Sequence, residues 1–332
     1  MAQPTRDPEP PTAPTPTARR LTRDDLQAVV AIDAALVGRT RNEFFERRLA
    51  AALARPEIHA QFGVDGPAGL EGFVLARLLD GEFGSHDTAL RLQAIGVSPS
   101  AQGHGAGRAL MRALEGAARK HGAGALRTTA AWTDHGMLGF LDHHGFSLAD
   151  SQIIDCAVHV GGLRSHQAPG SDDLDDEIRE RDQADVRTLT ASDLKAIVRI
   201  DRRITGRDRT PYMRRTLDAA LGESDIGVSL AAYDDDHIVG FLTARVDLGD
   251  AGRVESTAVL DTLDVDPDFR RRGIGHALVS QLFVNLSGLR VDRVETSVSK
   301  ADLALLGFFY DVGFGASQRL AFVKPVGMAS GD

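Results

Sequence analysis

The chain has 332 residues, which is enough for about two domains of ~150 residues each. Hydrophobic residues make up 42% and charged residues 26%, as in ordinary soluble globular proteins, and no apolar run of about eighteen residues or more predicts a membrane span. The net charge of −9 argues against nonspecific nucleic-acid binding, which depends on a cationic surface. We therefore expect neither a membrane nor a nucleic-acid partner.

The chain opens with a segment that is rich in Pro, Thr and Ala and lacks the apolar centre of a signal peptide. We expect residues 1–19 to form a disordered tail, because this composition buries too little apolar surface to offset the entropy of ordering. A first helix is predicted next. Thr22 stands three residues before Asp25, much as in a capping box, and Leu26 and Val29 follow at helical spacing.

A strand, a glycine-rich turn and a helix are predicted farther along, with the strand ending at Val97 and the turn reaching Gly107. The first N–H groups of a helix have no intrahelical partner, and the helix dipole adds partial positive charge there. Glycines at 105 and 107 let the backbone approach an anion, so the turn is predicted to bind a diphosphate. It is neither a P-loop, because no Gly-Lys-Ser/Thr follows, nor a Rossmann turn, because Gly-x-Gly-x-x-Gly is missing.

The single cysteine, Cys156, lies in the apolar run 153–158. One cysteine allows no intramolecular disulfide, which fits a reducing cytoplasm, and the expected role of Cys156 is that of a small buried hydrophobe. Residues 161–185 contain Gly-Gly, Pro-Gly and an acidic run. This composition predicts a solvated linker between domains at 20–160 and 186–328.

The second half is predicted to contain regular elements in a clear order. They are a helix after Thr190 and Asp193, a hairpin of strands 226–233 and 238–246, a strand at 254–265, a helix with Ala277, Leu278 and Leu282 on one face, a strand at 291–298, a helix at 303–310 and a strand at 320–326. This order is typical of an α/β or α+β domain with a mixed sheet.

The second half repeats the first at a constant offset of 168 residues. Pairs at this offset include Leu21 and Leu189, Asp33 and Asp201, Arg39 and Arg207, Arg41 and Arg209, Gly72 and Gly240, Gly105 and Gly273, and Phe146 and Phe314. An offset that is kept from end to end without a gap indicates a duplicated domain rather than a short-period solenoid. The two halves should therefore share one fold.

Each copy carries two motifs at the same spacing. The glycine turn reads Gln-Gly-His-Gly-Ala-Gly at 102–107 and Arg-Arg-Arg-Gly-Ile-Gly at 270–275, and Phe-x-x-x-x-Gly-Phe follows at 140–146 and 308–314. Together with the Val-x-Pro before each turn, these motifs resemble the GCN5-related N-acetyltransferase (GNAT) superfamily over nearly all of both halves. The resemblance implies two tandem α/β domains. Each would have a mixed, mostly antiparallel sheet, flanking helices and a splayed central strand pair.

The resemblance also implies acetyl-CoA as co-substrate, because GNAT proteins bind its pyrophosphate on this turn and its pantetheine along the preceding strand. An acceptor amine then attacks the thioester directly, and we expect N-acetyl transfer to a primary amine of a small molecule by a monomer or homodimer. No metal is expected, since the histidines lack chelate spacing. The positions that correspond to CoA contacts are Ile95, Val97, Gln102, Gly103, His104, Gly105, Ala106, Gly107 and Arg108, and Leu263, Val265, Arg270, Arg271, Arg272, Gly273, Ile274, Gly275 and His276.

Catalytic residues are harder to identify. Many GNAT proteins have a tyrosine directly after the first Phe of the second motif, thought to protonate the leaving thiolate, but here Leu141 and Phe309 stand there. Tyr310 comes one residue late, a rotation of roughly 100° on a helix. Glu255 and Asp261 are the candidate bases on the strand before the second turn. These carboxylates favour the second copy as the catalytic one, with the first either active as well or a binding and scaffolding copy.

Alternatives remain open. The missing tyrosine favours a non-catalytic acyl-CoA sensor, and the same chemistry could instead act on protein lysines or N-termini. The recurring Asp33, Arg39 and Arg41 could grip an acceptor carboxylate or fix a loop within each copy, whereas the acidic net charge favours a basic acceptor.

Overall fold

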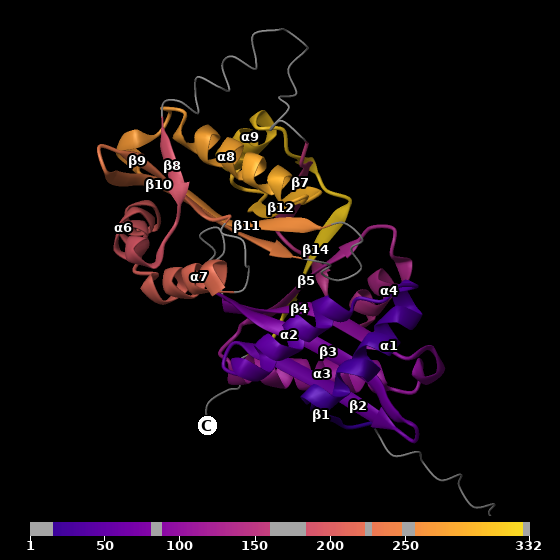
Figure 1. The fold of residues 1–332 in the computed structure, drawn as a ribbon. Helices are drawn as coiled ribbons and strands as arrows, with labels where there is room; N and C mark the ends of the chain where they lie inside the picture. Colours follow the sequence, from indigo (N-terminus) through magenta and orange to yellow (C-terminus); the bar gives the residue numbers. More distant parts are fainter. Residues whose placement is uncertain (1–15, 81–87, 160–183, 223–227, 248–255, 328–332) are drawn as a thin grey trace, which may run out of the picture.

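The computed structural model describes residues 16–80, 88–159, 184–222, 228–247 and 256–327. They form two seven-stranded mixed sheets with flanking helices (Figure 1), which confirms the predicted fold class. Most of the expected tail, most of the expected linker and the candidate base Glu255 lie outside these ranges. Within these ranges, no helix combines the length and apolarity needed to cross a bilayer.

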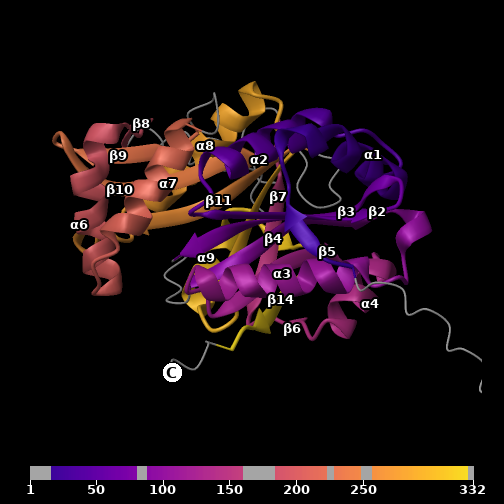
Figure 2. The ribbon, with the colours of Figure 1, turned by 90° about the horizontal axis from the view of Figure 1, so that it is seen from below.

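The first sheet has seven strands, six of them from the first repeat. In spatial order they are β1 (Ala18–Arg20), β2 (His59–Gly66), β3 (Gly69–Asp80), β4 (Thr88–Val97), β5 (Ala125–Ala131), β14 (Arg319–Pro325) and β6 (Ser147–Leu148). Helices α1 (Leu26–Val37) and α2 (Asn42–Ala54) cover one face, and α3 (Ala106–Lys120) covers the other (Figure 2). Helix α4 (His135–His143) follows β5.

The second sheet repeats this layout. Its order is β13 (Gly315–Ala316), β7 (Ser151–Ala157), β12 (Arg293–Ser299), β11 (Thr257–Val265), β10 (His237–Asp247), β9 (Leu230–Asp234) and β8 (Asp185–Thr188). The helices are α6 (Leu194–Thr205), α7 (Thr210–Gly222), α8 (Ile274–Gly288) and α9 (Leu303–Asp311). The predicted capping boxes are confirmed, since the N–H groups of Thr22 and Thr190 donate to Asp25 and Asp193 over 2.7 and 2.8 Å.

The two repeats exchange their last long strands. β14, from the end of the chain, lies between β5 and β6, and β7, from the first repeat, lies between β12 and β13. Both pairings are antiparallel along seven residues, with Arg319 opposite Ala131 and Ser151 opposite Ser299. The sequence predicts a strand in each place but not its partner, because alternation determines which face a residue takes and not which strand lies beside it.

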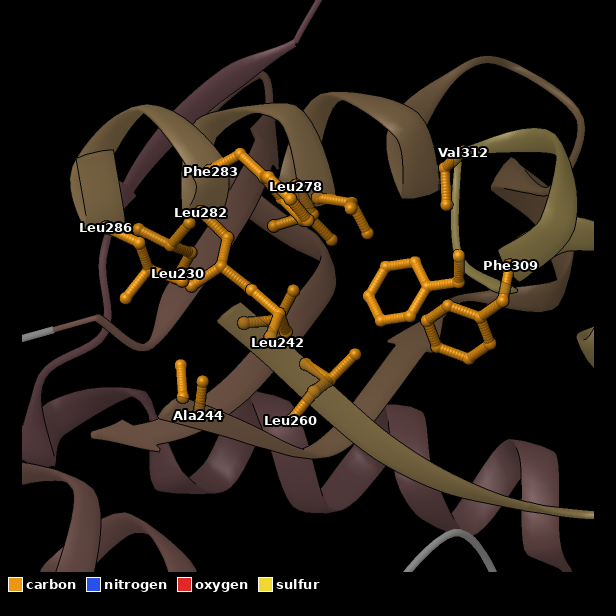
Figure 3. Packing of buried hydrophobic residues seen from close by; sticks show 14 of the residues in the cluster. Leu230, Leu242, Ala244, Leu260, Leu278, Leu282, Phe283, Leu286, Phe309 and Val312 are labelled. Carbon is orange, nitrogen blue, oxygen red and sulfur yellow. The ribbon is translucent and has the colours of Figure 1, made fainter. Parts of the chain in front are cut away.

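The exchanged strands contribute to the core of the other repeat. Ile154 of β7 is buried in the second core, and Phe322 of β14 is buried in the first. Figure 3 shows the second core, where Leu278 and Leu282 of α8 point toward Leu242 on the sheet. Each fully buried leucine contributes about 1.5–3 kcal/mol. The two halves therefore stabilise one another through shared strands as well as through their own helices.

Candidate functional site

In each sheet, two neighbouring parallel strands separate after three residue pairs. β4 pairs with β5 only from Ala89 to Arg91, and β11 pairs with β12 only from Thr257 to Val259. β4 then continues along β3 to Val97. We call the gap beyond Arg91 the first fork and the gap beyond Val259 the second fork. Alternate main-chain groups of a strand point to each neighbour, so residues 92–97 and 260–265 direct some of theirs into a fork.

The same threonine hydrogen bond and the same β-bulge lie at the start of both forks. The hydroxyl of Thr128 donates to the Leu92 carbonyl over 3.1 Å, and Thr296 donates to Leu260 over 3.0 Å. A β-bulge follows at once, because the pairing with the preceding strand skips Gln93 in one copy and Asp261 in the other. Bulges bend a strand and often stand beside active sites. Neither threonine belongs to a recognised motif, although the two are 168 residues apart like the other repeated residues.

A glycine turn with the same backbone leads from each fork into a helix. Gly105 and Gly273 are the N-cap residues of α3 and α8, with φ of 92° and 76°. Gly103 has φ of 80°, and its counterpart Arg271 takes φ of 59° although it is not a glycine. The positive φ values let the chain turn sharply into the helix, so that the N–H groups of the first helical turn stay available to an anion.

The last glycine of each turn, Gly107 or Gly275, has a packing role that the sequence alone does not indicate. A Cβ added at Gly107 would lie 3.1 Å from the ring of Phe140, and one added at Gly275 would lie 3.2 Å from Phe308. These rings belong to the Phe-x-x-x-x-Gly-Phe motifs. The two motifs therefore occur together because one packs directly against the other.

A cavity of about 640 Å³ follows the first fork. It is lined by Gly103, Gly105 and Arg108 of the turn and start of α3, by residues 92–97 and 128–131, and by residues from α1, the α1–α2 loop, α4 and β14. This volume is in the usual range for small-molecule sites. The predicted CoA contacts that line it are Ile95, Val97, Gln102, Gly103, Gly105, Gly107 and Arg108.

Residues 43–146 and 194–314 each match the Acetyltransferase (GNAT) family. The chain belongs to that family. GNAT proteins take the acyl group from acetyl-CoA or another acyl-CoA and act on amine acceptors, so the chain is an acyltransferase. Both matched regions end just before the exchanged strand of their repeat.

Known proteins resemble the chain in sequence or in fold. Ribosomal protein bS18-alanine N-acetyltransferase from Salmonella typhimurium is 29% identical over 126 residues, which cover 38% of this chain and 77% of that protein. A tandem GNAT protein from the clavulanic acid biosynthesis pathway has a TM-score of 0.61 at 17% identity, covering 94% of this chain and 98% of that one. A glucosamine N-acetyltransferase region of a fungal multi-domain β-N-acetylglucosaminidase has a TM-score of 0.62 at 16% identity, covering 94% of this chain and 38% of that longer one.

The repeated Asp and Arg of the first-helix loop form a buried ion pair in each GNAT copy. Arg41 donates to both carboxylate oxygens of Asp33 over 2.9 and 2.5 Å, and Arg209 bonds Asp201 in the same way. Arg41 also stacks 5.0 Å from the ring centroid of Phe44. These contacts favour the loop-fixing role, because an acceptor carboxylate would have to displace Asp33 to reach Arg41.

The second fork has larger polar side chains where the first has small ones. Asp264 takes the place of Gly96, and its carboxyl lies against Asp201 and Arg209. Burial, followed by the Asp201 carboxylate, raises the pKa of Asp264 from 3.8 to about 7. Thr262, which replaces an alanine, is bonded over 3.0 Å to the buried hydroxyl of Tyr212.

The second copy also ties its first helix to the glycine turn. Arg203 near the end of α6 donates to Asp266 over 2.5 Å and to Asp268 over 2.9 Å, and both aspartates precede the turn. The first copy has Ala35 at the position of Arg203, and Leu36 beside it lines the cavity. The Arg203 contacts have no counterpart at Ala35, which carries no charge.

Two of the three catalytic residues expected from the sequence, Asp261 and Tyr310, lie in the described part of the chain, and each contacts another side chain. The buried carboxylate of Asp261 accepts a 2.5 Å bond from Arg245. Tyr310 is 39% exposed on α9, and its hydroxyl accepts a 3.4 Å bond from Gln152 on β7. Their catalytic roles stay predictions. Among the residues described, no three His, Cys, Asp or Glu side chains are placed to hold a metal ion.

Proposed function

We propose that this GNAT protein transfers an acetyl group from acetyl-CoA to a primary amine of a small molecule, with the first fork as the donor site. The cavity along that fork carries the proposal. It joins a helix N-terminus suited to a diphosphate with a strand edge suited to the extended pantetheine arm.

The proposed roles follow from the lining of the cavity. The N–H groups of residues 103–107 and the side chain of Arg108 bind the diphosphate, and β4 pairs with the pantetheine. Main-chain N–H groups near the bulge at Gln93 polarise the thioester carbonyl. The acceptor nitrogen bonds to the carbonyl carbon as the C–S bond breaks, and water removes the ammonium proton. A thiol of pKa about 8.5 leaves without a dedicated acid.

The choice of copy differs from the one that the carboxylates of the second strand suggested. Asp261 is engaged by Arg245, whereas Asp264 is buried against Asp201 and Arg209 with its Oδ2 atom lacking a hydrogen-bond partner among the described residues. Only Asp261 is therefore set aside by its contacts, and the first fork is preferred for its cavity. Catalysis in the second fork stays an alternative. With the donor in the first fork, the second copy stabilises the first by supplying β14 to its sheet.

A protein acceptor is the second candidate, favoured by the sequence likeness to the ribosomal-protein alanine acetyltransferase. The test incubates the full chain with acetyl-CoA and either a panel of small amines or a protein extract. We expect release of free thiol that depends on a small amine, with the matching acetylated amine found by mass spectrometry. Mass shifts in proteins, without thiol release from small amines, would favour the second candidate. Binding of acetyl-CoA without thiol release from either would support the sensor alternative.

A further inference from the structure

A glutamine stands at the point where the first fork opens. Gln93 is the residue of β4 that the pairing with β3 skips, and it lines the cavity although it is only 6% exposed. The small accessible part of its side chain includes the carboxamide, and none of the described residues forms a hydrogen bond with that group. A polar group left unpaired under a bound molecule destabilises the complex. A ligand that fills the cavity should therefore offer this carboxamide a hydrogen bond.

The corresponding residue of the second copy shows toward which face the bulge directs this side chain. Asp261 occupies the same place in the second bulge and bonds to Arg245 of β10. Arg245 follows Ala244, which packs in the core under α8, so Arg245 and Asp261 lie on the opposite face, toward α6 and α7. Because the two bulges are alike, Gln93 projects toward α1 and α2 and away from α3 (Figure 2).

The charged side chains that line the cavity from α1, the α1–α2 loop and β14 already have partners. Arg41 pairs with Asp33 over 2.5 Å, and Arg319 donates to the hydroxyl of Thr129 over 2.6 Å. The other lining residues of α1 are apolar. The Gln93 carboxamide differs from these charged groups, since the described chain gives it no partner. It is also beside the bulge, where the proposed function places the thioester.

We propose that Gln93 positions the acceptor, with its side-chain oxygen accepting a hydrogen bond from the attacking amine. This inference rests on the proposed function of the first fork. As the nitrogen bonds to the carbonyl carbon and the C–S bond breaks, the nitrogen becomes positive and its N–H donates more strongly. The hydrogen bond to Gln93 is therefore strongest in the transition state, where it accelerates the reaction. The carboxamide takes up no proton, and the ammonium proton leaves to water.

The second fork has no equivalent group. Its counterpart of Gln93 is the carboxylate of Asp261, which is occupied by Arg245. The first copy keeps an arginine at the position of Arg245, Arg77, but has an uncharged amide in place of the aspartate. The change from a carboxylate to an amide thus separates a residue held within the sheet from one that can bind an acceptor.

The test compares the parent protein with the variants Gln93→Met, Gln93→Asn and Gln61→Met. Met keeps the length of the side chain but cannot accept the hydrogen bond, whereas Asn keeps the amide and shortens the side chain by one methylene. Gln61 of β2 is 3% exposed and does not line the cavity, so Gln61→Met is the matched control. Thiol release from acetyl-CoA gives kcat and the acceptor KM, with the small amine that the parent protein turns over fastest.

We expect Gln93→Met to lower kcat/KM for the amine by about 5- to 100-fold, the range for a buried donor that is left unpaired. Most of the loss should be in kcat, because the bond is strongest in the transition state. Gln93→Asn should recover part of the activity, and Gln61→Met should lose none. The dissociation constant of acetyl-CoA, measured by calorimetry, should be unchanged in all three variants.

Full activity of Gln93→Met would overturn the inference and leave the proposed function intact. A matching loss of affinity for acetyl-CoA would overturn it too, because Gln93 would then shape the donor site. No thiol release by the parent protein with any amine would overturn both. If circular dichroism shows that Gln93→Met does not fold, Gln93→Asn decides: a lower kcat with unchanged acetyl-CoA affinity supports the inference, and full activity contradicts it.

Discussion

The two GNAT copies share a backbone but differ in what their forks contain. Both copies have a threonine where the strands separate (Thr128 and Thr296), a β-bulge directly after it, and a glycine of positive φ before the helix (Gly105 and Gly273). The difference lies in side chains at a few positions, with Gly96 in the first fork and Asp264 in the second. Duplication thus preserved the groups that shape the fork, whereas substitutions along one strand changed the space inside it.

The largest expected effect is on acetyl-CoA binding. Gly105→Val places a β-branched residue at φ of 92°, and the first fork should lose affinity for acetyl-CoA by about 100-fold or more. The nearest atom to a new Cβ there is 3.7 Å away in Pro16, so the effect comes from backbone strain and from the blocked turn rather than from a clash. Calorimetric titration of acetyl-CoA measures it.

Gly273→Val is the matched control, because it places the same strain at the same position of the second turn. We expect it to leave the binding isotherm of the parent protein unchanged. Two binding events, each lost with its own variant, would mean that both forks bind the donor. Loss with Gly273→Val alone would reverse the comparison and return the donor site to the second copy. Circular dichroism on both variants separates loss of binding from loss of fold.

The next largest effect is on the pH dependence of the free energy of unfolding, and it comes from Asp264 in the second copy. An acid whose pKa is 3.8 unfolded and about 7 folded holds more protons in the folded state between those values. Its contribution to stability is therefore present below about pH 4 and is lost as the pH rises through 7. Asp264→Asn removes this loss, and should raise the free energy of unfolding at pH 8 by about 2–4 kcal/mol relative to the parent protein.

Urea unfolding at pH 5 and pH 8 measures that difference. The gain from Asp264→Asn should be smaller at pH 5 than at pH 8. A gain of equal size at both pH values would show that Asp264 does not titrate in this range. The first copy has Gly96 at this position, so this position adds no pH dependence to its free energy of unfolding.

The smallest effect should be the same in both copies. Thr128→Val and Thr296→Val keep the shape of the side chain but leave the carbonyl of Leu92 or Leu260 without its donor. Each should lower the free energy of unfolding by about 1–2 kcal/mol, independent of pH. Thr188→Val, at an exposed position on β8, is the control. A clear loss in one copy alone would mean that the two forks are not held open by the same bond.

Several features of the protein could be predicted because they depend on local backbone chemistry. The capping boxes at Thr22 and Thr190, the hairpin around residues 235–236 and the glycine turns are each specified by a few adjacent residues. The sequence also showed that the motif at 140–146 accompanies the glycine turn, although the reason, the packing of Phe140 on Gly107, came from the structure. The constant offset of 168 residues then carried each local conclusion from one copy to the other.

Other features depended on contacts between distant residues, and only the tertiary structure decided them. Arg319 is 190 residues from Thr129, and nothing near Arg319 in the sequence indicates that β14 pairs with β5 rather than with β12. Equivalent strands of a duplicated domain carry similar patterns, so either sheet can accept either strand by pattern alone. Local sequence therefore determined the turns and helices of each copy. The choice of sheet for each last strand, and with it the charge inside the first fork, came from long-range backbone pairing.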